Sequence, residues 1–193
     1  MNRALTIPYA LNERLVRGRV AFDALFVLAG SALIAIAAQI SIPVPFSPVP
    51  LTLQPLAVLL VGVVLGANRG AAAAVLYLLE GASGLPVFAM GHGGAMWLAG
   101  PTAGYLFAYP FAAFIAGWFS ERGWGSSVVR AVTGMLIALA VVYAGGWSWF
   151  AILTDGRTAF VLGVAPFVLA DVVKIALGAA LLPFAQRAIS PRG

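Results

Sequence analysis

Two charged side chains interrupt an otherwise apolar stretch near the end of the sequence, PFVLADVVKIALG. Asp171 and Lys174 are three residues apart, so a helix places both side chains on one face. Lys174 is the only lysine of the chain, and every other basic residue is an arginine. A charged group at the centre of a membrane helix costs about 2.5–3.5 kcal/mol on insertion scales, and such residues commonly serve a function.

Two interpretations of this pair remain open from the sequence. In the first, Asp171 and Lys174 form a structural ion pair that fixes the last helix in its bundle. In the second, a polar ligand lies between them, because a carboxylate accepts N–H donors and an ammonium donates to a carbonyl or a carboxylate. The second interpretation predicts a small ligand that presents both kinds of group.

The composition places the pair in a membrane protein. Of the 193 residues, 62% are hydrophobic and 9% are charged. Mean hydropathy is +1.01, and soluble domains contain about 25% charged residues. The length suits one compact domain. The net charge of +5 does not indicate nucleic-acid binding, because the arginines are scattered between apolar runs instead of clustering on one face.

Enzyme and metal chemistry have little support. The chain has no cysteine, one histidine and six acidic residues, and only Asp23, Glu80 and Asp171 among the acids lie near apolar segments, which makes no metal cluster. No P-loop, nucleophile elbow or zincin motif is present, and no polar residues repeat along a pore. We therefore expect no catalytic residue, metal or cofactor. Any active transport would draw its energy from a partner or an ion gradient.

Apolar segments of about 20 residues predict an all-α integral membrane protein with six transmembrane helices. The third helix, which begins at Gly70, either stops partway or runs on through Glu80. The TDGRTAFVLGVA segment before the last helix predicts a short extra turn. The six helices are expected near residues 21–41, 53–68, 70 onward, 102–120, 129–149 and 166–186.

The first apolar run could also belong to a signal peptide. Three arginines precede it, and AIA (35–37) has the form of a signal-peptidase site. The run is long for the core of a signal peptide, so we expect a retained transmembrane helix. The chain then divides into a basic N-terminal segment (1–20), one six-helix domain (21–187) and a C-terminal tail (188–193).

The arginines orient this six-helix arrangement. Basic residues gather on the cytoplasmic side of membrane proteins, and Arg157 alone falls on the side opposite the other nine. Both termini are therefore predicted to be cytoplasmic, while the proline-rich loop (41–52), the glycine-rich connection (81–105) and the connection before the last helix face outward. The nine are Arg3, Arg14, Arg17, Arg19, Arg69, Arg122, Arg130, Arg187 and Arg192.

The glycine-rich connection, GASGLPVFAMGHGGAMWLAGPTAGY, is uncharged and not periodic. Irregular backbone at membrane depth is tolerated only where protein or a cavity satisfies its amides. Transporters commonly bind substrate where helices are interrupted by glycine and proline. The connection is therefore either a re-entrant loop that closes the outer surface or the wall or lid of a pocket, and the absence of charge favours a pocket.

Small residues recur at a spacing of four along the first helix. Ser31 and Ala35 share one face, and Ala29, Leu33 and Ala37 share the next. Small residues at this spacing let another helix approach closely. That helix belongs either to the same bundle or to another subunit.

Four segments, in the same order, resemble the BioY family, the biotin-binding S components of energy-coupling factor (ECF) transporters. They are PVPLTLQ, LYLLEGASGLPVF, GHGGAMWLAGPTAGY and GVAPFVLADVVK. The resemblance covers nearly the whole chain past the N-terminal tail. It implies a six-helix S-component fold in the bacterial plasma (inner) membrane that captures biotin from outside with high affinity. It also implies uptake driven by a transmembrane coupling protein and two ATPase subunits, so that only the partners use ATP.

The resemblance assigns roles residue by residue. Asp171 and Lys174 match the family's aspartate and lysine on the last helix. His92 matches a binding residue between glycines that is commonly an amide in the family. Gln54, after the proline-rich loop, and Tyr105, after Gly-Pro-Thr, occupy matching positions that line or close the pocket.

Biotin itself fits these residue types. Its ureido group offers N–H donors and a carbonyl, and its valerate brings a carboxylate and an apolar tether, which suits a pocket with few polar groups in an apolar wall. Trp97 and Phe88, close to the matched motifs, are expected to pack on the thiophane ring and the valeryl chain. Which end of biotin meets Lys174 is left open.

The resemblance also bears on partners and alternatives. Small residues on the first helix of such proteins dock on the coupling subunit, which implies this role for Ser31 and Ala35. Some BioY proteins act without the energising module, and the sequence fits both cases. The alternatives are an S component for another small vitamin, or a solitary ion-coupled carrier with Asp171 or Glu80 as its proton site.

Overall fold

The computed structural model describes residues 19–189, which form seven α-helices, three short 3-10 helices and one two-stranded sheet. Most of the predicted N-terminal segment and C-terminal tail therefore lies outside the described residues. The α-helices are α2 (Arg19–Gln39), α3 (Gln54–Leu65), α4 (Ala67–Ala82), α5 (Ala103–Glu121), α6 (Val128–Leu153), α7 (Gly156–Gly163) and α8 (Ala165–Ile189). The 3-10 helices are η1 (Ala89–Gly91), η2 (Ala95–Ala99) and η3 (Trp124–Ser126), and the strands are β1 (Ser41–Ile42) and β2 (Leu51–Thr52).

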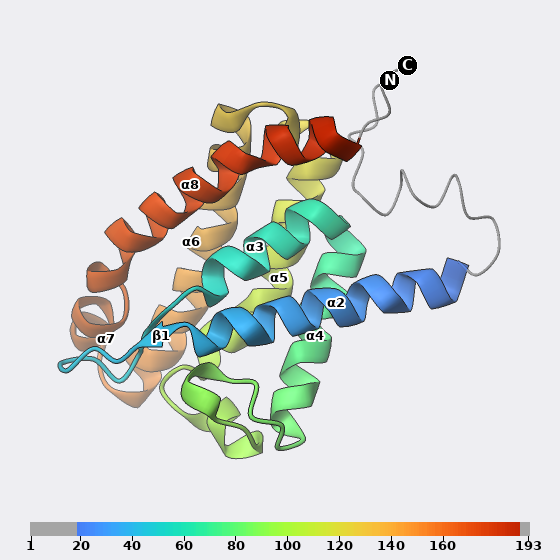
Figure 1. Ribbon diagram of the computed structural model, residues 1–193. Helices are drawn as coiled ribbons and strands as arrows, with labels where there is room; N and C mark the ends of the chain where they lie inside the picture. The colour runs from blue at the N-terminus through green and yellow to red at the C-terminus, as the bar shows by residue number, and fades with distance from the viewer. Residues whose placement is uncertain (1–18, 190–193) are drawn as a thin grey trace.

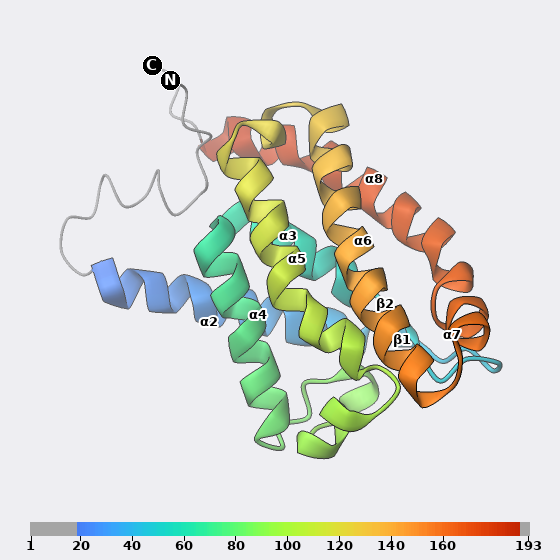
Figure 2. The same ribbon diagram turned by 180° about the vertical axis from the view of Figure 1, so that it is seen from behind.

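The helices form two layers (Figures 1 and 2). In one layer α4, α5 and α6 lie side by side, and α2, α3 and α8 cross them in the other. The loop between the paired strands β1 and β2, the connection from α4 to α5 and the helix α7 gather at one end of the molecule. Most of the irregular backbone is therefore at this end.

The predicted number of spans is not confirmed. By length and composition α2, α5 and α6 can each cross a membrane, and the pair α7 and α8, bent by 41°, gives a fourth candidate. Helix α3 has 12 residues, which is about 18 Å of helix, whereas the hydrocarbon core is about 30 Å thick. The helices α2, α5, α6 and α8 nevertheless agree within a few residues with four of the six predicted helices.

The second and third predicted helices are joined by one residue, Gly66, at φ 88°. A side chain would be strained in that conformation, so glycine permits the sharp turn. Helix α4 begins at Ala67 and runs on through Glu80, which is the longer of the two predicted alternatives. The Glu121 carboxylate at the end of α5 accepts the Ala67 N–H at 2.8 Å, which satisfies one free donor of the first turn of α4.

The short turn predicted before the last helix is the eight-residue helix α7. Asp155 caps it, because its carboxylate accepts the backbone N–H groups of Arg157 at 2.9 Å and Thr158 at 3.0 Å. The hydrogen bonds with Thr158 lower the pKa of the exposed Asp155 carboxyl. This cap fixes the start of a short helix that carries too few residues to form a span.

A glycine at the crossing point lets α3 pack directly on α5. A Cβ atom built at Gly62 would lie 2.2 Å from the carbonyl oxygen of Ala113, closer than real Cβ atoms come to a neighbour. Interfaces between membrane helices commonly use small residues in this way. The fully buried Val58 and Leu59 place α3 at the centre of the core.

Gly62→Ala is expected to destabilise the protein by about 1–3 kcal/mol, because the added methyl group would push α3 away from the α5 backbone. Thermal unfolding in detergent measures the effect. Gly156→Ala is the matched control, since it is also a helical glycine but has its nearest contact at an ordinary 3.6 Å, to the Trp147 ring. Equal melting temperatures for the two variants would contradict the close packing of α3 on α5.

Candidate functional site

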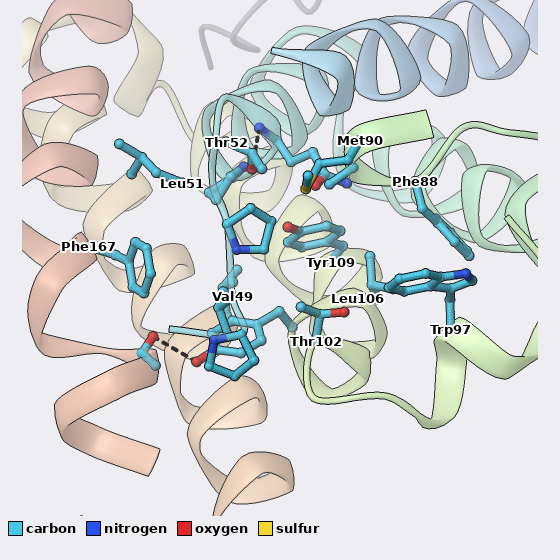
Figure 3. Close-up of a pocket in the computed structure, with 18 of the residues that line it drawn as sticks. Val49, Leu51, Thr52, Phe88, Met90, Trp97, Thr102, Leu106, Tyr109 and Phe167 are labelled. Carbon is cyan, nitrogen blue, oxygen red and sulfur yellow. Dashed lines mark hydrogen bonds between the residues drawn. The ribbon is translucent and has the colours of Figure 1, made fainter. Parts of the chain in front are cut away.

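A cavity of about 200 Å³ opens at the end of the molecule where the irregular segments gather (Figure 3). Its wall comes from the β1–β2 hairpin, the connection between α4 and α5, the helices α3, α5, α6 and α8, and the end of α7. Most of this wall is apolar, as in typical small-molecule sites. Its polar side chains are Thr52, Gln54, His92, Thr102, Tyr105, Tyr109, Tyr143 and Asp171.

Asp171 on α8 is a buried carboxylate, 4% exposed, in the wall of the cavity. Its Oδ1 lies 2.5 Å from Lys174 Nζ. Its Oδ2 accepts a hydrogen bond from the Tyr143 hydroxyl at 2.6 Å. Lys174 Nζ also donates to the Thr52 carbonyl oxygen at 2.7 Å. These contacts tie α8 to α6 and to β2.

The contact distance leaves no room for a ligand between Asp171 and Lys174 in this structure. In this structure the two side chains form an ion pair with each other, as in the first of the two sequence interpretations. Asp171 also faces the cavity, whereas Lys174 is not part of its wall. A ligand in the cavity would therefore reach the pair from the side of Asp171.

Gln54, the first residue of α3, lines the cavity and is 3% exposed. Its Nε2 donates to the hydroxyl of the buried Tyr77 at 2.6 Å, which leaves the amide oxygen as an acceptor. Pro55 follows within the first turn, where a helix tolerates the missing N–H. The structure thus places Gln54 beside the cavity.

His92 and Trp97 stack on each other in the connection between α4 and α5, with ring centroids 3.8 Å apart. Both line the cavity. His92 Nδ1 lies 2.8 Å from the Ala89 carbonyl oxygen. A carbonyl only accepts, so Nδ1 carries the proton and a neutral ring presents Nε2 as an acceptor. Figure 3 shows Trp97 near Phe88, on the side of the cavity opposite Phe167.

Phe88 and Tyr105 also line the cavity, and both are held by protein contacts. The buried Phe88 ring meets the Tyr77 ring edge-on at a centroid distance of 5.6 Å. The Tyr105 hydroxyl donates to the Gly163 carbonyl oxygen at 2.7 Å, which joins α5 to the end of α7. These two side chains therefore shape the wall.

Two tyrosines of the cavity were not predicted from the sequence. Tyr143 holds Asp171 from α6. Tyr109 lies one turn after Tyr105 on α5, and Figure 3 shows its ring in the middle of the cavity wall. Among the side chains that the structure describes (residues 20–180 and 182), none bonds its hydroxyl and no buried polar atom lacks a partner, so the hydroxyl faces the cavity. The spacing of four from Tyr105 could have indicated this shared face.

The face of α2 that carries Ser31 and Ala35 packs within the chain. Ser31 is fully buried, and its hydroxyl donates to the Glu80 carboxylate on α4. Ala35 is half-buried against the core. The partner-docking role expected for Ser31 does not fit this position, because a neighbouring helix already covers it. The exposed face of α2 carries Leu25, Leu28, Leu33 and Ile36.

Comparisons of the sequence find relatives over most of the chain. The model of the BioY family matches residues 11–191. A Pyrococcus horikoshii protein described as a probable biotin transporter BioY is 45% identical over 157 residues, which are 81% of this chain and 89% of that protein. A Thermotoga maritima protein described as biotin transporter BioY is 40% identical over 153 residues, 77% of this chain and 86% of that protein.

A solved structure has the same fold. The crystal structure of the S-component for biotin from an ECF-type ABC transporter superposes with a TM-score of 0.79. The match covers 91% of this chain and 94% of that chain at 24% sequence identity. The fold agrees with the family match, and the chain belongs to the BioY family.

Proposed function

We propose that this protein captures biotin outside the cell and takes it up as the S component of an ECF transporter. Membership of the BioY family supports the proposal, as do relatives described as biotin transporters and the fold shared with a biotin S-component. The observation that carries it is the cavity, in which one carboxylate, Asp171, lies in a mostly apolar wall.

The ureido group of biotin is proposed to meet Asp171. A carboxylate offers about four lone-pair sites for hydrogen bonds, and Lys174 and Tyr143 each take one of them. The remaining sites can accept the ureido N–H groups. The valerate carboxylate would be repelled by Asp171, so we place it away from Asp171, on the side of Trp97, whose indole N–H is a donor.

Other groups complete the proposed site. The rings of Phe88 and Trp97 would cover the apolar parts of biotin. The amide oxygen of Gln54 and the hydroxyl of Tyr109 would supply further hydrogen bonds. Lys174 would act indirectly, because its ammonium holds the carboxylate that meets the ligand.

The arginines support a cavity that faces outward. Arg69, Arg122 and Arg130 lie where α4 begins, α5 ends and α6 begins, at the end of the molecule opposite the cavity, whereas Arg157 lies on α7 beside it. Under the positive-inside rule, we place the domain 21–187 in the bacterial inner membrane with both termini in the cytoplasm. Energy would come from a transmembrane coupling protein and two ATPase subunits.

Asp171→Asn is expected to weaken biotin binding about 10- to 100-fold, because a hydrogen bond to a charged acceptor contributes about 1.5–3 kcal/mol. Titration calorimetry in detergent measures the Kd. Asp23→Asn is the matched control, since Asp23 also pairs with a cation, Arg69, at 2.6 Å but lies away from the cavity. Equal Kd values for the two variants would rule out the proposed role of Asp171.

Two tyrosine variants separate ligand contact from wall structure. Tyr109→Phe is expected to lower biotin affinity about 10-fold with an unchanged melting temperature, because no other described residue bonds this hydroxyl. Tyr105→Phe is expected to lower the melting temperature, because it leaves the Gly163 carbonyl without its partner. Calorimetry and thermal unfolding of the same samples measure both, and the reverse pattern would refute these assignments.

Uptake of labelled biotin in cells with and without the coupling module tests the transport role. We expect uptake to require the module and to persist when a protonophore collapses the proton gradient while ATP is maintained. Uptake that needs no module and stops with the protonophore would instead identify a solitary ion-coupled carrier. Cells that take up no labelled biotin with the module present, but do take up another labelled vitamin, would identify a different ligand.

A further inference from the structure

The cavity wall between Phe88 and His92 is a tight hairpin. The Phe88 N–H donates to the His92 carbonyl oxygen at 2.9 Å, and the two residues form an antiparallel bridge. Between them Met90 and Gly91 have left-handed backbone, with φ 62° and 74°. Phe88, Met90 and His92 line the cavity, so the conformation of the hairpin sets the shape of this wall.

Met90 is the strained position of the hairpin. Two successive left-handed residues are typical of hairpin turns built from Asn-Gly or Gly-Gly, and positive φ is uncommon in other residue types. Among residues 19–189, Met90 is the only non-glycine residue with positive φ. Its side chain is 52% exposed, so side-chain packing alone does not hold this conformation.

The side-chain amide of Gln39, the last residue of α2, holds the backbone on both sides of Met90. The two N–H groups of its Nε2 are shared among the carbonyl oxygens of Val87 at 3.3 Å, Phe88 at 3.2 Å and, within α2, Ala35 at 3.2 Å. Its Oε1 accepts the Gly91 N–H at 2.9 Å. These partners fix the orientation of the amide, because a flipped amide would set oxygen against carbonyl oxygen. Gln39 itself is not part of the cavity wall.

We propose that Gln39 is a positioning residue that holds the hairpin of residues 88–92 against the cavity and thereby sets how fast the ligand leaves. Helix α2 presents the amide from a fixed position, because Ser31 is hydrogen-bonded to Glu80 on α4. The effect on ligand release rests on the proposed function of biotin binding. The effect on the hairpin does not depend on the ligand.

Amide hydrogen exchange of the protein without biotin tests the positioning. Gln39→Leu removes these hydrogen bonds, and exchange in the peptide 87–92 is expected to become about 10-fold faster. Gln39→Glu keeps an acceptor for the Gly91 N–H but loses the donor, so an intermediate rate is expected. Ile36→Ala, at an exposed position on the same helix, is the control and should match the wild type. Unchanged exchange in Gln39→Leu would overturn the proposal.

Adding Met90→Gly to Gln39→Leu separates positioning from a general loss of stability. Glycine adopts the left-handed conformation without strain, so the double variant is expected to regain most of the wild-type protection from exchange. If Gln39 only stabilised the fold in general, a change at residue 90 would not restore the protection from exchange. If the double variant exchanges as fast as Gln39→Leu, Gln39 does not act by holding the Met90 backbone.

The dissociation rate of labelled biotin tests the consequence for the ligand. Gln39→Leu is expected to release biotin about 10-fold faster, with an unchanged association rate and an unchanged melting temperature without ligand. Faster exchange with an unchanged dissociation rate would overturn the link to ligand release. If the wild type itself does not bind biotin, the proposed function fails, while the exchange measurements still decide the role of Gln39.

Discussion

The buried contact of Asp171 with Lys174 is the interaction on which the candidate site depends. Charged groups inside a membrane protein persist only when they are paired and hydrogen-bonded. Here each has a partner besides the other, the Tyr143 hydroxyl on α6 and the Thr52 carbonyl on β2. Three elements therefore meet at one ion pair. Both residues belong to the ion pair, and of the two only Asp171 also lines the cavity.

The long helices could be predicted from the sequence, because hydrophobic length alone reveals them. The two short helices were placed correctly along the chain, α3 within the segment 53–68 and α7 as a short turn, but their lengths could not be predicted. With 12 residues in α3 and eight in α7, neither has the length of a span. The turn between α3 and α4 depends on the backbone conformation of Gly66, which no hydrophobic period reveals. The six spans were predicted from the length of the apolar segments. In the folded chain some of these segments form helices that are too short to cross a membrane.

Residues of the candidate site could be singled out from the sequence where a residue type is out of place. Asp171 stands out in an apolar helix, and His92 stands out between glycines. Tyr109 does not, because the role of a tyrosine depends on what its hydroxyl meets across the bundle. Small residues at a spacing of four also leave the neighbour undetermined. For that reason the burial of Ser31 against Glu80 became clear only from the packing of α2 on α4.

Helix α2 is fastened to the rest of the protein at intervals of eight residues, by Asp23 to Arg69, by Ser31 to Glu80 and by Gln39 to the hairpin. At 1.5 Å per residue the first and last of these points are about 24 Å apart. The Arg69 end of the molecule and the hairpin in the cavity wall are therefore attached to one continuous helix.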